Sequence, residues 1–394
     1  MKRKITLLAF FMFFFSFIIG ISFKMSLKKI FEVFLTGAVD LATLKVVAVV
    51  ILVEIMSNVL SYSGKLKKIT SSFELFARNR YLSLIFPSLL MGHLPVPAGA
   101  MLSAPLVQEA GNKMNLSAET KTFLNYWFRH IFEFIWPIYP GIILAAAILG
   151  ISVYKFIAAQ LPLFLASVVA GVLFGLRKLS LEKYTSCAQE DNPRSIRRFF
   201  ALLMNIWPVL GIVFLVLIFK LDIVLSLFLI VIFAIFTNKK MTKKLPPILK
   251  RSFEWRIIFL IFSVLIFKKM LEMSGILPFI PGIFKWLRIP EIFTLFFIPF
   301  LIGTISGLSM ATVGIAFPVL LPLIGENSPN LTYAMLAFAG GVSGYLLSPF
   351  HLCLVVSTAY FKASFRKVWE MVILPVLFVD SVAFIVFYLS QFKW

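Results

Sequence analysis

Residues 86–105 read FPSLLMGHLPVPAGAMLSAP, an apolar stretch interrupted by prolines, glycines and small side chains. Residues 298–322 have the same character about two hundred positions later. Three pairs of matching residues recur in one order: Pro87 and Pro299 (212 residues apart), Pro137 and Pro349 (212), and Gly64 and Gly275 (211). Interrupted hydrophobic segments at corresponding places in two halves are typical of the substrate site of a secondary transporter. The pattern predicts two repeats of one membrane module.

The composition is that of a polytopic membrane protein. Of the 394 residues, 60% are hydrophobic and 45 are Phe, and the mean hydropathy is +0.98, far above the range of soluble domains. The net charge of +21 comes from Lys and Arg in short polar links, which indicates cytoplasmic loops and not a nucleic-acid surface. Cys187 and Cys353 have no metal-site spacing and form no disulfide framework. The basic, apolar N-terminus lacks a small-residue cleavage site, so we expect a retained first helix.

Apolar runs long enough to cross a bilayer alternate with charged links. Continuous spans are predicted at 5–23, 46–62, 154–176, 199–219, 223–236, 257–275 and 368–390. Two longer segments, 116–150 and 331–362, contain prolines and are expected to be discontinuous helices. Residues 25–41 and 65–80 have helical periodicity with many charges, which favours helices along the membrane surface. The halves are 1–176, with a hairpin at 82–110, and 199–394, with a hairpin at 291–325, joined by a link at 177–198.

The basic links give an orientation. Placing 65–80, 177–198, 239–256 and 362–367 in the cytoplasm agrees with one threading, with a cytoplasmic N-terminus and the inner membrane as the location. That threading requires both hairpins to enter and leave through one face. The first hairpin then enters from the cytoplasm and the second from outside. The repeats are therefore expected to be inverted and the hairpins re-entrant.

The hairpin tips are the first candidate binding elements. Broken backbone at membrane depth is tolerated where protein or a wet cavity satisfies its polar groups, and helix N-termini at such breaks favour anions. In the first hairpin the candidates are Pro97, Ala98, Gly99 and Ser103. In the second they are Thr304, Ser306, Ser309 and Thr312, whose hydroxyls could also accept from a small cation. The alternative is that these small residues only allow close helix packing.

Ionisable and polar residues inside spans are the second set of candidates. Arg129, His130 and Glu133 precede the first break, His93 lies in the first hairpin, and Ser348 and His351 flank Pro349. Arg129 and Glu133 are four residues apart, so an internal ion pair fits as well as substrate binding. A histidine at position 351 that only donates to a freed carbonyl is an open alternative. Glu133 is the first candidate for proton coupling, with Glu54, Glu109 and Asp380 as weaker ones.

The sequence carries no enzyme signature. It lacks a glycine-rich phosphate loop, a His-Glu-x-x-His motif and a Gly-x-Ser-x-Gly elbow. An intramembrane hydrolase using Ser103 with His93 or His130 would leave the repeat unexplained. We therefore expect no enzyme and no cofactor beyond a coupling proton or sodium ion.

The segments GHLPVPAGAMLSAP (92–105) and SPFHLCLVVSTAYF (348–361) resemble the family bearing domain of unknown function 401. That likeness covers nearly the whole chain, and the arrangement of broken segments resembles the wider ion transporter superfamily of divalent-anion/sodium symporters, citrate and arsenite carriers and gluconate permeases. The resemblance implies an all-α polytopic membrane protein of about ten spans, with two inverted repeats. It also implies a homodimer, a small anionic substrate between the hairpin tips, and an elevator motion of a transport domain.

The Ser-Asn-Thr tips of the sodium/dicarboxylate members fall on Pro97, Ala98 and Gly99, and on Ser309, Met310 and the neighbourhood of Thr312. The first tip lacks the expected side-chain oxygens, which puts a paired sodium site in doubt and makes proton coupling at least as plausible. The expectation is a proton- or sodium-coupled transporter of a carboxylate or oxyanion. An accessory membrane protein with a lipid- or partner-binding cavity is the alternative, and a passive channel is a third possibility.

Overall fold

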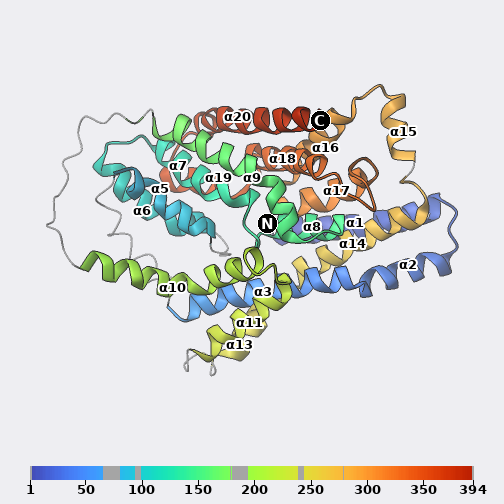
Figure 1. The fold of residues 1–394 in the computed structure, drawn as a ribbon, viewed down its shortest axis with the longest axis horizontal. Helices are drawn as coiled ribbons and strands as arrows, with labels where there is room; N and C mark the ends of the chain where they lie inside the picture. Colours follow the sequence, from blue (N-terminus) through green and yellow to red (C-terminus); the bar gives the residue numbers. More distant parts are fainter. Residues whose placement is uncertain are drawn as a thin grey trace.

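The computed structural model describes residues 2–64, 80–93, 99–177, 179, 194–237, 244–277 and 279–392, and in these ranges every regular element is a helix (Figure 1). The first half contains α1 (Lys2–Ser22), α2 (Leu27–Val39), α3 (Leu41–Tyr62), α5 (Arg80–His93), α6 (Gly99–Lys113), α7 (Ala118–His130), the 3₁₀ turn η2 (Ile131–Phe134), α8 (Pro140–Leu149), α9 (Val153–Ala170) and the π-helical η3 (Gly171–Leu176). The second half contains α10 (Arg194–Leu217), α11 (Ile223–Phe236), α13 (Leu245–Ser252), α14 (Trp255–Ser274), α15 (Phe279–Trp286), α16 (Glu291–Ser306), α17 (Ser309–Ile324), α18 (Leu331–Leu347), α19 (Leu352–Phe361) and α20 (Phe365–Gln391).

The chain is an all-helical membrane protein. Among the described residues, four stretches are long and apolar enough to cross a bilayer: Leu41–Tyr62, Val153–Leu176, Leu331–Phe361 and Phe365–Gln391. Large apolar side chains such as Phe14 and Phe233 are exposed on the outside of the bundle. An exposed apolar exterior suits contact with lipid chains and would be a liability in water.

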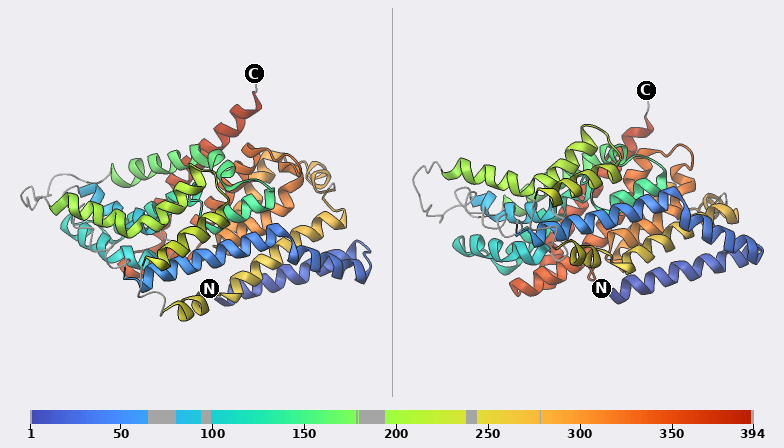
Figure 2. Two further views of the ribbon diagram at one scale, coloured as in Figure 1. Left: turned by 60° about the horizontal axis from the view of Figure 1, so that its bottom comes forward. Right: turned by 90° about the horizontal axis from the view of Figure 1, so that it is seen from below.

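Two groups of helices can be distinguished by their contacts. α1 packs along α14, α14 also packs on α2, and α3 packs on α11 and α13. Figure 2 shows α1 and α14 side by side at one edge of the molecule in both views. The second group contains the two pairs α5–α6 and α16–α17 with the helices that follow them. In this group α6 packs on α19, α17 packs on α8, and α9 packs on α20.

Several sequence landmarks set the helix ends. Asp40 and Asp222 begin α3 and α11 by accepting hydrogen bonds from backbone N–H groups of the first turn, as N-cap residues do. Gly64 and Gly275, one of the matched pairs, follow α3 and α14 with φ of 72° and 74°. This left-handed conformation is easy for glycine and ends a helix. Both matched glycines therefore lie at a helix end, Gly275 directly after α14 and Gly64 two residues after the end of α3.

The two proline-containing segments are broken where the sequence indicates. Between α7 and α8 the chain passes through η2 and a non-helical stretch at 135–139 that contains Pro137. Between α18 and α19 the break covers 348–351 and contains Pro349. The stretches 86–105 and 298–322 fall in the pairs α5–α6 and α16–α17.

The other surface elements differ in how much of them the structure describes. α2 packs on α14, with Ile30 buried, but Phe31 is 71% exposed, so its outer face is apolar as well as charged. The predicted surface helix at 65–80 lies outside the described residues except for Arg80. Most of the predicted link at 177–198 lies outside them too, and α10 begins at Arg194, five residues before the predicted start at 199.

Candidate functional site

The residue before the proline of each break anchors that break to the hairpin of its own half. Trp136 Nε1 donates to the backbone oxygen of His93 at 3.0 Å. Ser348 Oγ donates to the backbone oxygen of Thr304 at 2.6 Å. Both acceptors are in the last turn of a hairpin's first helix, where carbonyls have no partner within the helix. Trp136 and Ser348 are themselves 212 residues apart.

The residue two positions after each proline makes a second contact of the same kind. Tyr139 donates its hydroxyl to the Gly92 carbonyl at 2.6 Å. His351 Nδ1 lies 3.0 Å from the Gly307 carbonyl, and because a carbonyl only accepts, Nδ1 carries the proton. His351 thus donates to a hairpin carbonyl, as in the open alternative, and its Nε2 faces a second histidine.

Glycines bring each hairpin close to the following helix. A Cβ on Gly92 would lie 2.6 Å from the Arg129 carbonyl, and a Cβ on Gly303 would lie 2.6 Å from the Gly341 carbonyl. These distances are too short for any side chain, so both glycines are required by the backbone approach. The two glycines are 211 residues apart and their partners 212. The close packing also confirms that the small residues of these stretches do have a packing role.

Three helix N-termini gather around the tip of the second hairpin. α8, α17 and α19 begin after Tyr139, Leu308 and His351, and none of these three residues caps its helix with a side chain. Ser309 Oγ is so close to Gly141, in the first turn of α8, that a Cβ there would lie at 2.2 Å. Gly307, at the same tip, is packed closely against the backbone at the start of α19. The partial positive charges of the three helices therefore face one region.

Two histidines meet beside this region. His130 ends α7 and His351 precedes α19, and their Nε2 atoms are 3.0 Å apart. His130 Nδ1 lies 2.6 Å from the Tyr126 carbonyl. The Tyr345 ring stacks on His351 with centroids 5.6 Å apart. The Tyr345 hydroxyl is buried, and Glu133 is its polar neighbour.

Arg129 and Glu133 do not pair with each other. Arg129 donates to the Met91 carbonyl at 3.0 Å, and no ion pair joins it to Glu133 in the described part of the chain. The reason is local: the α-helix ends at His130 and a 3₁₀ turn follows, which changes the residue spacing so that positions 129 and 133 no longer share a face. Glu133 is buried and lies near the Tyr345 hydroxyl.

Asn125 is a polar centre that the sequence did not reveal. It is fully buried and accepts from Ser103 at 2.7 Å and from Ser88 at 3.3 Å. Its amide donates to the Ala100 carbonyl at 3.1 Å and to Ser357 Oγ at 2.9 Å. It thus connects both helices of the first hairpin, α7 and α19. Only its position in an otherwise apolar segment could have indicated a role.

The remaining predicted residues lie in different parts of the fold. His93 lies against the rings of Phe132 and Trp136, at 3.8 and 4.2 Å between centroids, away from the histidine pair. Ser306 and Thr312 bond to each other at 3.2 Å across the second tip. Thr304 Oγ1 donates to the Phe300 carbonyl at 2.8 Å.

The first tip is largely undescribed. Pro97 and Ala98 lie outside the described residues, and Gly99 is the first residue of α6.

The weaker coupling candidates lie elsewhere. Asp380 is buried and accepts from Ser343 at 2.5 Å, a contact between α20 and α18 that suits helix packing. Glu109 is exposed and pairs with Lys113 at 2.9 Å. Glu54 is on α3, among the helices that pack with α1 and α14.

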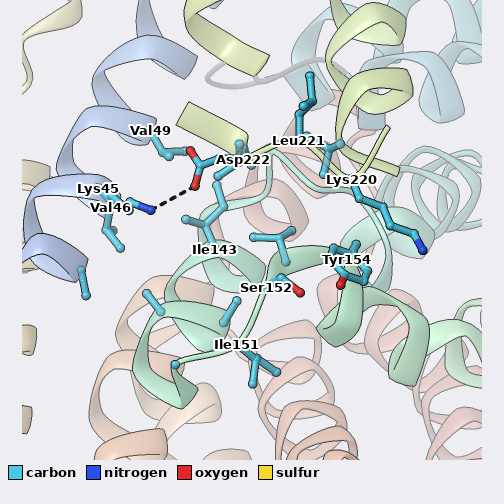
Figure 3. A pocket seen from close by; sticks show the side chains of 17 residues that line it. Lys45, Val46, Val49, Ile143, Ile151, Ser152, Tyr154, Lys220, Leu221 and Asp222 are labelled. Atoms are coloured by element: carbon cyan, nitrogen blue, oxygen red, sulfur yellow. Dashed lines mark hydrogen bonds and ion pairs between the residues drawn. The ribbon is translucent and has the colours of Figure 1, made fainter. Parts of the chain in front are cut away.

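A cavity of about 370 Å³ opens between the start of α3, the end of α8 and the α10–α11 turn (Figure 3). Its walls are mostly apolar, and Lys45 and Asp222 form an ion pair at 3.2 Å within it. Lys220 lies over the Tyr154 ring at 5.7 Å. None of the predicted site residues lines this cavity.

Comparison with known protein families gives a match. The family described as "Protein of unknown function (DUF401)" matches residues 1–389, which is nearly the whole chain. No curated protein matches.

Proposed function

This chain belongs to the DUF401 family, and we propose that it is a secondary active transporter of a small anion, a carboxylate or an inorganic oxyanion. The observation that carries the proposal is the meeting of three helix N-termini, those of α8, α17 and α19, without side-chain caps at the tip of the second hairpin. Unpaired N–H groups and helix dipoles together form an anion site, and discontinuous helices bind anionic substrates in this way in transporters.

The side chains around these termini support an anionic ligand. Arg129, His130 and His351 are basic, and Glu133 is an acidic group near the histidine pair. Ser309 begins α17 next to Gly141 and presents a hydroxyl to the same region. Substrate oxygens would accept from the N–H groups and from this hydroxyl, and the basic side chains would balance the charge.

The repeated contacts support two copies of one module. Trp136 and Ser348, Tyr139 and His351, and Gly92 and Gly303 have equivalent partners at a spacing of 211 or 212 residues. α6 packs on α19 and α17 on α8, so each hairpin contacts the broken helix of the other half. Reciprocal contacts of this kind suit inverted repeats with re-entrant hairpins, within a fold of about ten spans.

The two groups of helices suggest how access would alternate. In the proposal, the helices that pack with α1, α3 and α14 form a scaffold, which dimerises in the inner membrane with the N-terminus in the cytoplasm. The hairpins and broken helices move against it as an elevator. Glu133 is the proposed proton-coupling group, because a buried carboxyl beside two imidazoles can exchange a proton as the site fills and empties. Sodium is the alternative coupling ion.

Ligand-dependent stability tests the site. The purified chain is screened by thermal shift against carboxylates, sugar acids and oxyanions, since a ligand of the folded state stabilises it by about 2.7 kcal/mol at a hundred times its Kd. Combining Ser309→Ala with His351→Ala should remove the shift. Ser381→Ala, an exposed serine on α20 that bonds only its own helix, is the control. A shift that survives the double substitution would place the ligand elsewhere.

A second candidate is a non-transporting accessory protein that holds a lipid or a partner helix. The observation in its favour is the cavity of about 370 Å³, which is mostly apolar and carries the Lys45–Asp222 pair. This candidate predicts that phospholipid co-purifies in a fixed ratio and that anions produce no thermal shift.

A further inference from the structure

Cys353 completes a three-residue cluster with the histidine pair. His130, His351 and Cys353 place one potential ligand atom each within 4.8 Å of the others. The sequence separates His130 from Cys353 by more than two hundred residues, so no local spacing reveals the cluster. We propose that these three side chains form a binding site for a thiophilic transition-metal ion of the Zn²⁺ or Cu⁺ class. This site goes beyond the proposed transport function and does not depend on it.

The tautomers of both histidines follow from their backbone partners. His130 Nδ1 faces the Tyr126 carbonyl at 2.6 Å, and His351 Nδ1 faces the Gly307 carbonyl at 3.0 Å. Because carbonyl oxygens only accept hydrogen bonds, each Nδ1 must carry the proton. Each neutral ring then has its lone pair on Nε2. A metal-bound histidine commonly uses one nitrogen for the metal and donates the other N–H to a carbonyl in this way.

The two Nε2 atoms face each other at 3.0 Å. Two lone pairs at this distance repel unless a cation lies between them, which is either a shared proton or a metal ion. Nitrogens bound tetrahedrally to zinc at about 2.0–2.1 Å are about 3.3–3.4 Å apart. The imidazoles therefore need to separate by only a few tenths of an ångström to accept a metal ion.

The presence of Cys353 in the cluster favours a bound metal ion over a proton shared by the two imidazoles. A proton shared by two imidazoles gains nothing from a third ligand, whereas sulfur and imidazole together suit Zn²⁺ and Cu⁺. Cys353 and His351 are partly exposed.

The cluster supplies three protein ligands, which leaves a fourth position open. Zinc sites with three protein ligands usually bind water or a substrate in that position. His351 directly precedes α19, and the Tyr345 ring stacks on it. Since His351 is also bonded to Gly307 at the hairpin tip, a bound metal would fix α7, α19 and the second hairpin relative to one another.

The test is metal titration of the purified full-length chain in detergent. We expect one Zn²⁺ per chain, and with Co²⁺ a thiolate-to-cobalt charge-transfer absorption that Zn²⁺ displaces. Affinity should fall by at least about tenfold in His130→Ala, His351→Ala and Cys353→Ser, because even outer partners of metal ligands are worth about 10–100-fold. The controls are His93→Gln and Cys187→Ser, which change the chain's third histidine and its second cysteine and should bind Zn²⁺ as the native chain does.

If a variant misfolds, metal titration of the native chain alone still tests the proposed site. Absence of stoichiometric Zn²⁺ binding, or a Co²⁺ spectrum without a thiolate band, would overturn the metal site in favour of a shared proton. Cys353→Ser separates the two in a second way, since it keeps both imidazoles and the shape of the site. If this variant binds Zn²⁺ as tightly as the native chain, Cys353 is no ligand and the proposal fails.

Discussion

Replacing Asn125 by alanine tests whether the first hairpin is held to the broken helices by one buried amide. The change removes four hydrogen bonds: those to Ser103, Ser88, the Ala100 carbonyl and Ser357. Side-chain hydrogen bonds in membrane proteins average about 0.6 kcal/mol, and about 1 kcal/mol is usual in soluble ones. Four such bonds predict a loss of about 2 to 4 kcal/mol in the free energy of unfolding.

A matched substitution in the other group of helices serves as the control. Asn58, on α3, donates two hydrogen bonds, to the Glu54 carbonyl at 3.0 Å and to Ser252 Oγ at 2.9 Å. Asn58→Ala should therefore cost about half as much, about 1 to 2 kcal/mol. Both are measured by reversible unfolding in mixed micelles with increasing sodium dodecyl sulfate. If Asn125→Ala lowers the free energy of unfolding by no more than Asn58→Ala does, the buried amide does not hold the first hairpin to the broken helices.

Three further substitutions test the packing of the hairpins and breaks. Gly344→Ala should destabilise the fold severely, because its Cβ would lie 2.1 Å from the Phe300 carbonyl and push α16 from α18; unfolding at the native midpoint would contradict this close approach. Gly307→Ala places a side chain at φ 65° and should cost at least about 1 to 2 kcal/mol in the same assay, whereas a neutral effect would mean that the tip relaxes. Tyr139→Phe removes the hydrogen bond to Gly92 and should cost about 0.5–1.5 kcal/mol, and a stabilised variant would exclude the contact.

The prolines and glycines made much of the fold predictable. Pro137 and Pro349 cannot donate to a helix ladder, so both breaks were visible at 212-residue spacing before any contact was known. Gly64 and Gly275 marked two helix ends, because a positive φ is easy only for glycine. The helices that meet at a candidate site were therefore largely predictable from local chain properties.

The candidate site was less predictable, because contacts between segments distant in the sequence bring its residues together. Cys353 had no nearby partner in the sequence, and only the fold brings it to His130. The role of Asn125 could not be read from its own segment beyond its polarity, because its partners come from other helices. The expectation for Arg129 and Glu133 assumed a continuous α-helix, and the 3₁₀ turn after His130 removed that spacing.

Uptake of a labelled anion into proteoliposomes is the direct test of the proposed transport function. The anion is chosen as the one that gives the largest thermal shift, and a proton or sodium gradient is imposed across the vesicle membrane. We expect saturable uptake that requires the gradient, is absent when Ser309→Ala and His351→Ala are combined, and is retained in Ser381→Ala. Uptake at the background rate of empty vesicles for every stabilising anion under both gradients would contradict it.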